Sequence, residues 1–133
     1  MKIPKFEAQT EWVKPTEFPD LRQVEEIAID LETKDPDLIK KGSGSVIGNG
    51  EVIGIAVATK YFKGYFPIAH EGGGNMDRTR VLSWLKDILE SPSTKVFHNA
   101  IYDVCWLRAM GFKINGDIAC TMIAAALTDE NRF

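Results

Sequence analysis

The chain has 133 residues, 44% of them hydrophobic and 26% charged, with a formal net charge of −3. This size and balance are ordinary for one globular domain with a buried core, and nothing in the composition argues for two. The net charge argues against a protein that holds nucleic acid through its own clustered Lys and Arg. No run is long enough to span a bilayer and no signal-peptide region opens the chain, so we expect a cytoplasmic protein without a membrane partner.

Residues 1–20 are rich in proline and predict an irregular arm, which we expect to lie against the domain or a neighbour. Its aromatic residues Trp12 and Phe18 are expected to be exposed. A buried strand is predicted over residues 25–31, where an apolar run begins.

Residues 35–50 contain several glycines whose spacing matches neither the dinucleotide-binding fingerprint nor the phosphate-binding P-loop. We therefore expect a flexible loop there. The segments 52–59 and 61–68 are rich in β-branched and aromatic residues, and they predict a pair of adjacent antiparallel strands.

The second half of the chain alternates helices with strands. Apolar residues at helical spacing predict a helix over residues 77–89. A strand over 95–98 then leads into a helix over 99–110, and a strand over 118–120 leads into a helix that begins at 121–127. Three strands followed by helix, strand, helix and strand predict an α/β fold. Cysteines 105 and 120 have no metal-binding spacing and predict buried, reduced thiols.

Two acidic residues, Asp30 and Glu32, end the first predicted strand. Side chains alternate across a strand, so both point to the same face. Two like charges this close repel each other unless a cation or a proton lies between them, which indicates a divalent metal site. The alternative is a solvated strand edge, since 19 of the 133 residues are acidic.

A second pair, Asn99 and Asp103, opens the predicted helix over 99–110 and shares one of its faces. Asp103 lies among apolar residues, where a carboxylate is costly without a compensating charge. In the alternative, Asn99 is a simple helix N-cap and Asp103 a favourable first-turn charge. That alternative does not explain why the pair accompanies Asp30 and Glu32.

These two motifs resemble the first and second motifs of the DEDD 3′-5′ exonucleases. The strings around them, residues 29–33 and 97–103, are similar to the proofreading domain of A-family, phage-type DNA polymerases. The resemblance runs from about residue 21 to residue 133 and implies an RNase H-like mixed sheet flanked by helices. The family's third motif, Tyr or His followed by Asp four residues later, does not follow before Phe133, so we expect a C-terminally incomplete exonuclease domain over 21–133.

The resemblance implies hydrolysis of nucleotides from a single-stranded DNA 3′ end with two Mg²⁺ or Mn²⁺ ions. Hard oxygen ligands favour these ions over zinc, and no His or Cys cluster competes. The implied catalytic residues and metal ligands are Asp30, Glu32 and Asp103, with Asp30 bridging the two ions. The residues implied to touch the terminal nucleotides are Thr33, Asn99 and Tyr102.

The implied partners are the DNA end and a polymerase domain in the same or a separate chain, in the host cytoplasm if the chain is phage-encoded. Two alternatives remain. One is an RNA-processing exonuclease of the same superfamily. The other is a non-catalytic split or truncated piece that docks on a polymerase, which the missing third motif favours for this chain alone. His98 is expected to make a local hydrogen bond, and His70 is a loop residue from which the sequence alone indicates nothing.

Overall fold

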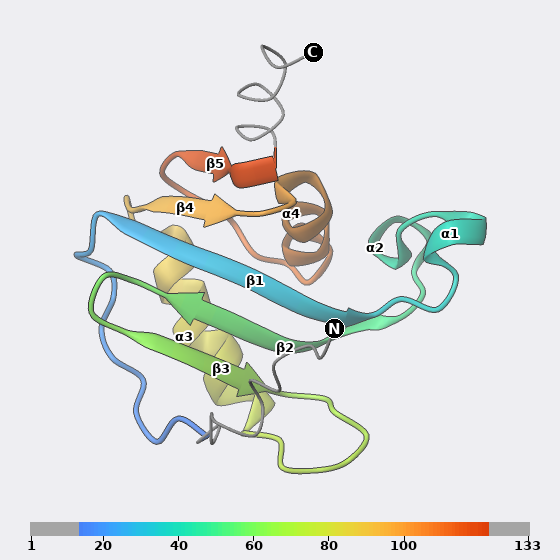
Figure 1. The fold of residues 1–133 in the computed structure, drawn as a ribbon, viewed down its shortest axis with the longest axis horizontal. Helices are drawn as coiled ribbons and strands as arrows, with labels where there is room; N and C mark the ends of the chain where they lie inside the picture. Colours follow the sequence, from blue (N-terminus) through green and yellow to red (C-terminus); the bar gives the residue numbers. More distant parts are fainter. Residues whose placement is uncertain (1–13, 123–133) are drawn as a thin grey trace, which may run out of the picture.

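The computed structural model of the chain describes residues 14–122, which form one five-stranded mixed sheet with helices (Figure 1). The elements in chain order are β1 (Glu26–Lys34), α1 (Leu38–Lys41), α2 (Gly44–Ile47), β2 (Glu51–Ala58), β3 (Lys63–Pro67), α3 (Arg78–Glu90), β4 (Thr94–Phe97), α4 (Ala100–Ala109) and β5 (Ile118–Cys120). The strands lie in the order β3-β2-β1-β4-β5. β1 is central, antiparallel to β2 and parallel to β4. This is the RNase H-like mixed sheet that the family resemblance implies.

The core lies between the sheet and its two long helices. Residues on β1 alternate strictly, because Ile27, Ile29 and Leu31 are buried whereas the residues between them are exposed. Both parallel crossovers, β3-α3-β4 and β4-α4-β5, move across the sheet in the same direction, so their right-handed turns place α3 and α4 on the same face (Figure 1). The apolar stripe of α3 that packs there consists of Val81, Leu85, Ile88 and Leu89.

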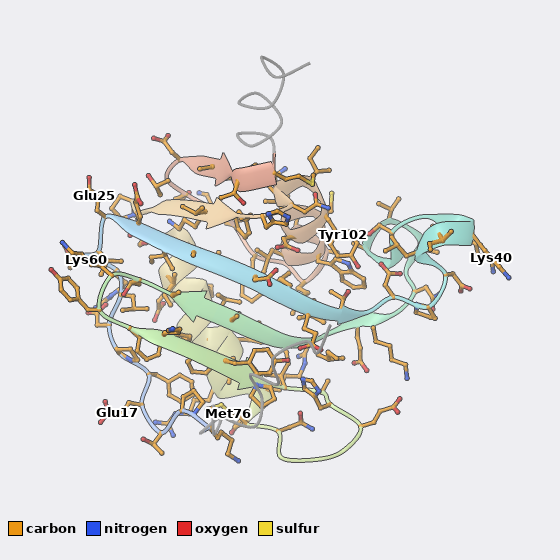
Figure 2. The ribbon with its side chains drawn as sticks, viewed as in Figure 1. Glu17, Glu25, Lys40, Lys60, Met76 and Tyr102 are labelled. Atoms are coloured by element: carbon orange, nitrogen blue, oxygen red, sulfur yellow. The ribbon has the colours of Figure 1, made fainter. Side chains whose placement is uncertain are left out.

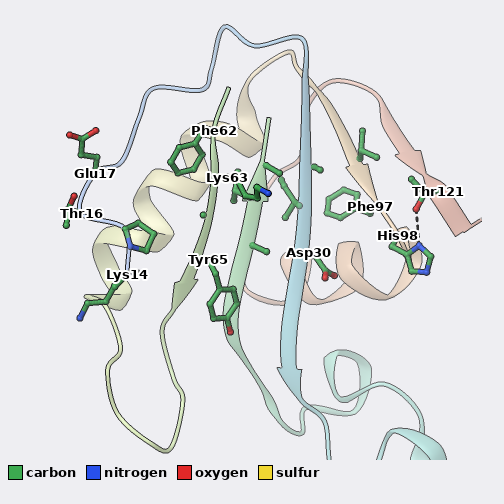
Figure 3. A pocket seen from close by; sticks show the side chains of 18 residues that line it. Lys14, Thr16, Glu17, Asp30, Phe62, Lys63, Tyr65, Phe97, His98 and Thr121 are labelled. Carbon is green, nitrogen blue, oxygen red and sulfur yellow. Dashed lines mark hydrogen bonds between the residues drawn. The ribbon is translucent and has the colours of Figure 1, made fainter. Parts of the chain in front are cut away.

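The other face of the sheet carries an open hollow of about 990 Å³ (Figure 3). Small and apolar residues of β1, β2 and β4 form much of its lining, among them Ala28, Ala56 and Val96. Within residues 14–122, no helix covers this face (Figure 1). Asp30 lines the hollow, so its side chain is accessible from solution.

The described part of the N-terminal arm packs against the domain, as predicted. The ring of Phe18 lies 5.7 Å from that of Phe66 and 5.6 Å from that of Trp84, and the Trp84 indole donates a hydrogen bond of 2.7 Å to the Pro19 carbonyl. Phe18 is therefore half-buried, and the expectation that it is exposed was wrong. Trp12 lies outside the described residues.

The segment between β1 and β2 is structured, so the prediction of a flexible loop was wrong. It contains α1 and α2, and both carboxylate oxygens of Asp35 accept from the Gly44 backbone N–H at 3.0 Å. A Cβ at Gly44 would lie 1.8 Å from the Asn49 carbonyl oxygen, so only glycine fits there. These tertiary hydrogen bonds order a segment whose glycine content alone suggests flexibility.

The remaining predicted elements occur within a few residues of their expected bounds. Asp77 caps α3 by accepting from the Arg80 backbone N–H. Of the last predicted helix, residues 121 and 122 are helical, and the rest lies outside the described residues. In the described part of the chain, no helix is long and apolar enough to cross a membrane.

A buried lysine joins the loops at the amino ends of β4 and β5. Lys95 is 0% exposed, and its ammonium group donates to the backbone carbonyls of Ser91, Ser93 and Asn115, the latter two at 2.8 Å. Burial lowers the pKa of Lys95. The three carbonyl dipoles compensate the buried charge in place of an acidic partner.

We predict that Lys95→Met destabilises the domain by about 2 kcal/mol, because three buried carbonyl groups lose their donor. Urea unfolding measures this change. Lys63→Met, the same substitution at an exposed position of β3, is the control and should change the free energy of unfolding by less than about 0.5 kcal/mol. Equal effects of the two substitutions would contradict the role given to Lys95.

Candidate active site

The site forms where β1 extends beyond its parallel neighbour. β4 pairs only with residues 26–28 of β1, after which the chain turns into α4. Asn99 caps this helix, and its side-chain oxygen accepts from the Tyr102 backbone N–H at 3.5 Å. The first turn of α4 therefore lies beside the part of β1 that carries the acidic residues, and Asp103 belongs to this turn.

Asp103 is the buried acid of the site, with an exposed fraction of 3%. The pKa of Asp103 is raised from 3.8 to about 6, chiefly by burial and in addition by the negative charge of Asp30, whereas a hydrogen bond from the Leu31 backbone lowers it. The structure thus brings together Asp30 and Asp103, which are more than 70 residues apart in the chain. Asp30 itself is exposed, on the open face of the sheet.

Glu32 is also exposed and is directed toward β3, where the Tyr65 hydroxyl donates to its Oε2 at 2.7 Å. Within residues 14–122, no group of three or more His, Cys, Asp and Glu side chains is placed to hold a metal ion. The structure therefore shows an electrostatic interaction between Asp30 and Asp103, whereas Glu32, on the same face of β1, is hydrogen-bonded to Tyr65.

Thr33 and Tyr102, both predicted to touch substrate, contact each other. The Tyr102 hydroxyl donates to Asp35 Oδ2 at 2.8 Å, so Thr33 Oγ1, also at 2.8 Å, donates to the Tyr102 oxygen. Tyr102 points from α4 toward the segment that contains α1 and α2 (Figure 2). Burial raises the pKa of Tyr102, which keeps the hydroxyl protonated as a donor.

His98 follows β4, and its Nδ1 shares a hydrogen bond of 3.0 Å with Oγ1 of Thr121, 23 residues further along the chain (Figure 3). Cys105 and Cys120 do not form a disulfide with each other, and both are half-buried rather than fully buried.

Sequence reasoning missed Asp35, Tyr65 and His70. Asp35 holds Tyr102, Tyr65 holds Glu32, and His70 contacts the Tyr65 hydroxyl through Nε2 at 2.5 Å. The sequence alone does not indicate this contact of His70. Strand alternation could have placed Tyr65 on the same face as Asp30, but only the register across three strands shows which acid it reaches.

The donor set suits a hard divalent cation. Asp30 and Asp103 offer carboxylate oxygens, their mutual repulsion is relieved by a positive charge, and no thiolate or imidazole belongs to the pair. Such a cation can activate a water molecule and stabilise a leaving oxygen in phosphodiester hydrolysis.

Comparisons with known proteins identify the family of the chain. Residues 18–133 match the family described as 3′-5′ exonuclease. The chain is 41% identical over 114 residues to the DNA-directed DNA polymerase of Pseudomonas phage M6, covering 78% of this chain and 16% of that protein. It is 28% identical over 116 residues to the DNA polymerase DpoZ of Acinetobacter phage SH-Ab 15497, covering 86% of this chain and again 16% of the relative.

Among solved structures, NrnC of Brucella melitensis with bound Mg²⁺ has a similar fold. It superposes with a TM-score of 0.55 at 23% sequence identity, covering 84% of this chain and 49% of NrnC. The two acidic motifs, the mixed sheet and the match over residues 18–133 lead to one conclusion. The chain belongs to the family of 3′-5′ exonuclease domains found in A-family, phage-type DNA polymerases.

Proposed function

We propose that residues 21–133, preceded by the arm over 1–20, are part of a proofreading exonuclease that removes nucleotides from a single-stranded DNA 3′ end. The observation that carries the proposal is the pair Asp30 and Asp103, two acids from distant motifs placed so close that the charge of one raises the pKa of the other. The relatives support a DNA substrate, since they are phage DNA polymerases. A polymerase domain is the proposed partner.

Asp30, Glu32 and Asp103 are the proposed ligands of two Mg²⁺ or Mn²⁺ ions, which when bound supply an activated water and stabilise the leaving oxygen. Asn99, Thr33 and Tyr102 are proposed to hold the terminal nucleotides. The tyrosine suits this task because Thr33 and Asp35 fix the direction of its hydroxyl before substrate arrives. A fourth acid, from the family's third motif, is not present in residues 1–133.

We predict that Asp30→Ala lowers the rate of 3′-end removal by about 10³-fold or more, because losing this carboxylate removes the anchor of the metal pair, worth several kcal/mol in the transition state. The assay follows a labelled single-stranded DNA with Mg²⁺ or Mn²⁺, using the chain extended through a third motif. Asp87→Ala, at an exposed position of α3, is the matched control and should leave the rate unchanged.

Chelation of the metal should stop the reaction, and residues 1–133 alone should be far slower than the extended form. A matched RNA strand separates the DNA-specific enzyme from an RNA-processing one. Activity that persists in Asp30→Ala would refute the proposed mechanism. An inactive extended form would support a non-catalytic docking role instead.

We also predict that Asp103→Asn stabilises the metal-free domain at pH 8 by about 1–2 kcal/mol while abolishing activity. The folded protein holds the Asp103 proton more tightly than the unfolded chain does, since its pKa is raised from 3.8 to about 6. The wild type therefore loses stability relative to the Asn variant as the pH rises from about 4 to about 6.

Urea unfolding with chelator at pH 4 and pH 8 measures this difference. The two proteins should be similar at pH 4 and diverge at pH 8, whereas Mg²⁺ should stabilise the wild type more than the variant. Equal free energies of unfolding at both pH values would show that Asp103 is not strained by burial and by Asp30.

A further inference from the structure

Tyr65 crosses the open sheet face to reach Glu32. In the register of the sheet, Tyr65 of β3 lies opposite Ala56 of β2, and Glu32 of β1 lies opposite Gly54 of β2. Tyr65 and Glu32 are therefore not directly opposite each other across the sheet, and β2 lies between their two strands. The tyrosine ring bridges them diagonally, and its hydroxyl donates to Glu32 Oε2 at 2.7 Å.

This crossing depends on the absence of a side chain at Gly54. A Cβ at this position would lie 1.8 Å from the Tyr65 hydroxyl oxygen and 2.3 Å from the ring carbon that bears it. Gly54 has no positive φ, so its backbone does not require glycine. Glycine is unfavourable inside a strand unless something approaches closely, and here the tyrosine occupies the space.

His70 is a second hydrogen-bond partner of the Tyr65 hydroxyl. Its Nε2 lies 2.5 Å from the Tyr65 oxygen, and because the hydroxyl proton goes to Glu32, the imidazole is the donor. The His70 backbone is itself fixed by Asn75, whose side chain accepts from the His70 N–H at 2.8 Å and donates to its carbonyl at 2.9 Å. An ion pair between Lys34 and Glu71 ties the same loop to the end of β1.

We propose that Tyr65 is a positioning residue for Glu32 and that it prepares the Glu32 carboxylate to bind a divalent cation. His70 orients the Tyr65 hydroxyl, and the absence of a side chain at Gly54 leaves space for it. The proposal rests on the metal-dependent function proposed above. The hydrogen bond engages one carboxylate oxygen, Oε2, so it sets the rotation of the group and the direction of Oε1. Outer partners of this kind orient metal ligands and raise the affinity of the site.

The chemistry of the hydroxyl suits this role. A tyrosine hydroxyl carries one proton, and the hydroxyl of Tyr65 donates it to Glu32. Glu32 is exposed, and without the hydrogen bond from Tyr65 its side chain would be free to sample other rotamers.

The test uses the natural protein with all its flanking sequence and measures Mn²⁺ affinity without DNA by electron paramagnetic resonance. Tyr65→Phe keeps the ring and removes the hydroxyl, and should weaken Mn²⁺ binding about 10-fold. Tyr61→Phe, the same change at an exposed tyrosine of the neighbouring turn, should have no effect. Urea unfolding of each variant shows that the fold is kept.

Three further variants separate positioning from general damage. Gly54→Ala should reproduce the loss of affinity, and combining it with Tyr65→Phe should add little, since both break one contact. His70→Gln, which can still present a donor nitrogen, should retain most of the affinity, whereas His70→Leu should not. In exonuclease assays, Tyr65→Phe should raise the Mg²⁺ concentration for half-maximal rate about 10-fold and leave the KM for DNA unchanged.

Unchanged Mn²⁺ affinity in Tyr65→Phe would overturn the proposal, as would fully additive losses in the Gly54→Ala and Tyr65→Phe double variant. Asp30→Ala, measured in the same series, distinguishes this failure from that of the proposed function. If Asp30→Ala loses Mn²⁺ and activity while Tyr65→Phe keeps both, only the positioning role is wrong. If Asp30→Ala keeps both, the metal site itself is misplaced and both proposals fail.

Discussion

The alternation of side chains along β1 is the constraint on which both the core and the site depend. Ile27, Ile29 and Leu31 are buried against the helical layer, which forces Asp30 and Glu32 onto the open face. A shift of one residue in strand register would bury both acids and expose the apolar set. The free energy gained by burying three large aliphatic side chains therefore also keeps Asp30 and Glu32 on the open face of the sheet.

The same strand extends past β4, and this difference in length creates the site. β4 pairs only with residues 26–28, so the first turn of α4 rather than a strand approaches the rest of β1 on that side. Asp103 is consequently buried beside Asp30, at a cost that appears as a raised pKa. Such strain is typical of functional sites, where a ligand rather than the fold compensates it.

Two tyrosines hold the end of β1 from opposite sides. Tyr65 reaches Glu32 from β3, and Tyr102 reaches Thr33 from α4. Each hydroxyl has another partner that determines its direction, His70 for the first and Asp35 for the second. Asp35 also orders the segment between β1 and β2 through Gly44, so the site and that segment are one hydrogen-bonded unit. Preorganisation of this kind reduces the entropy lost on binding.

The sequence by itself determined the element types, the α/β class and the common face of Asp30 and Glu32, because these follow from local periodicity. It also identified Asp103 as a carboxylate among apolar neighbours. Only the tertiary structure decided that Glu32 faces Tyr65, that His70 takes part, and that residues 35–50 are ordered. These contacts depend on the register of three strands and on the space left by Gly54, since hydrogen bonds between residues far apart in the chain leave no periodic pattern in it.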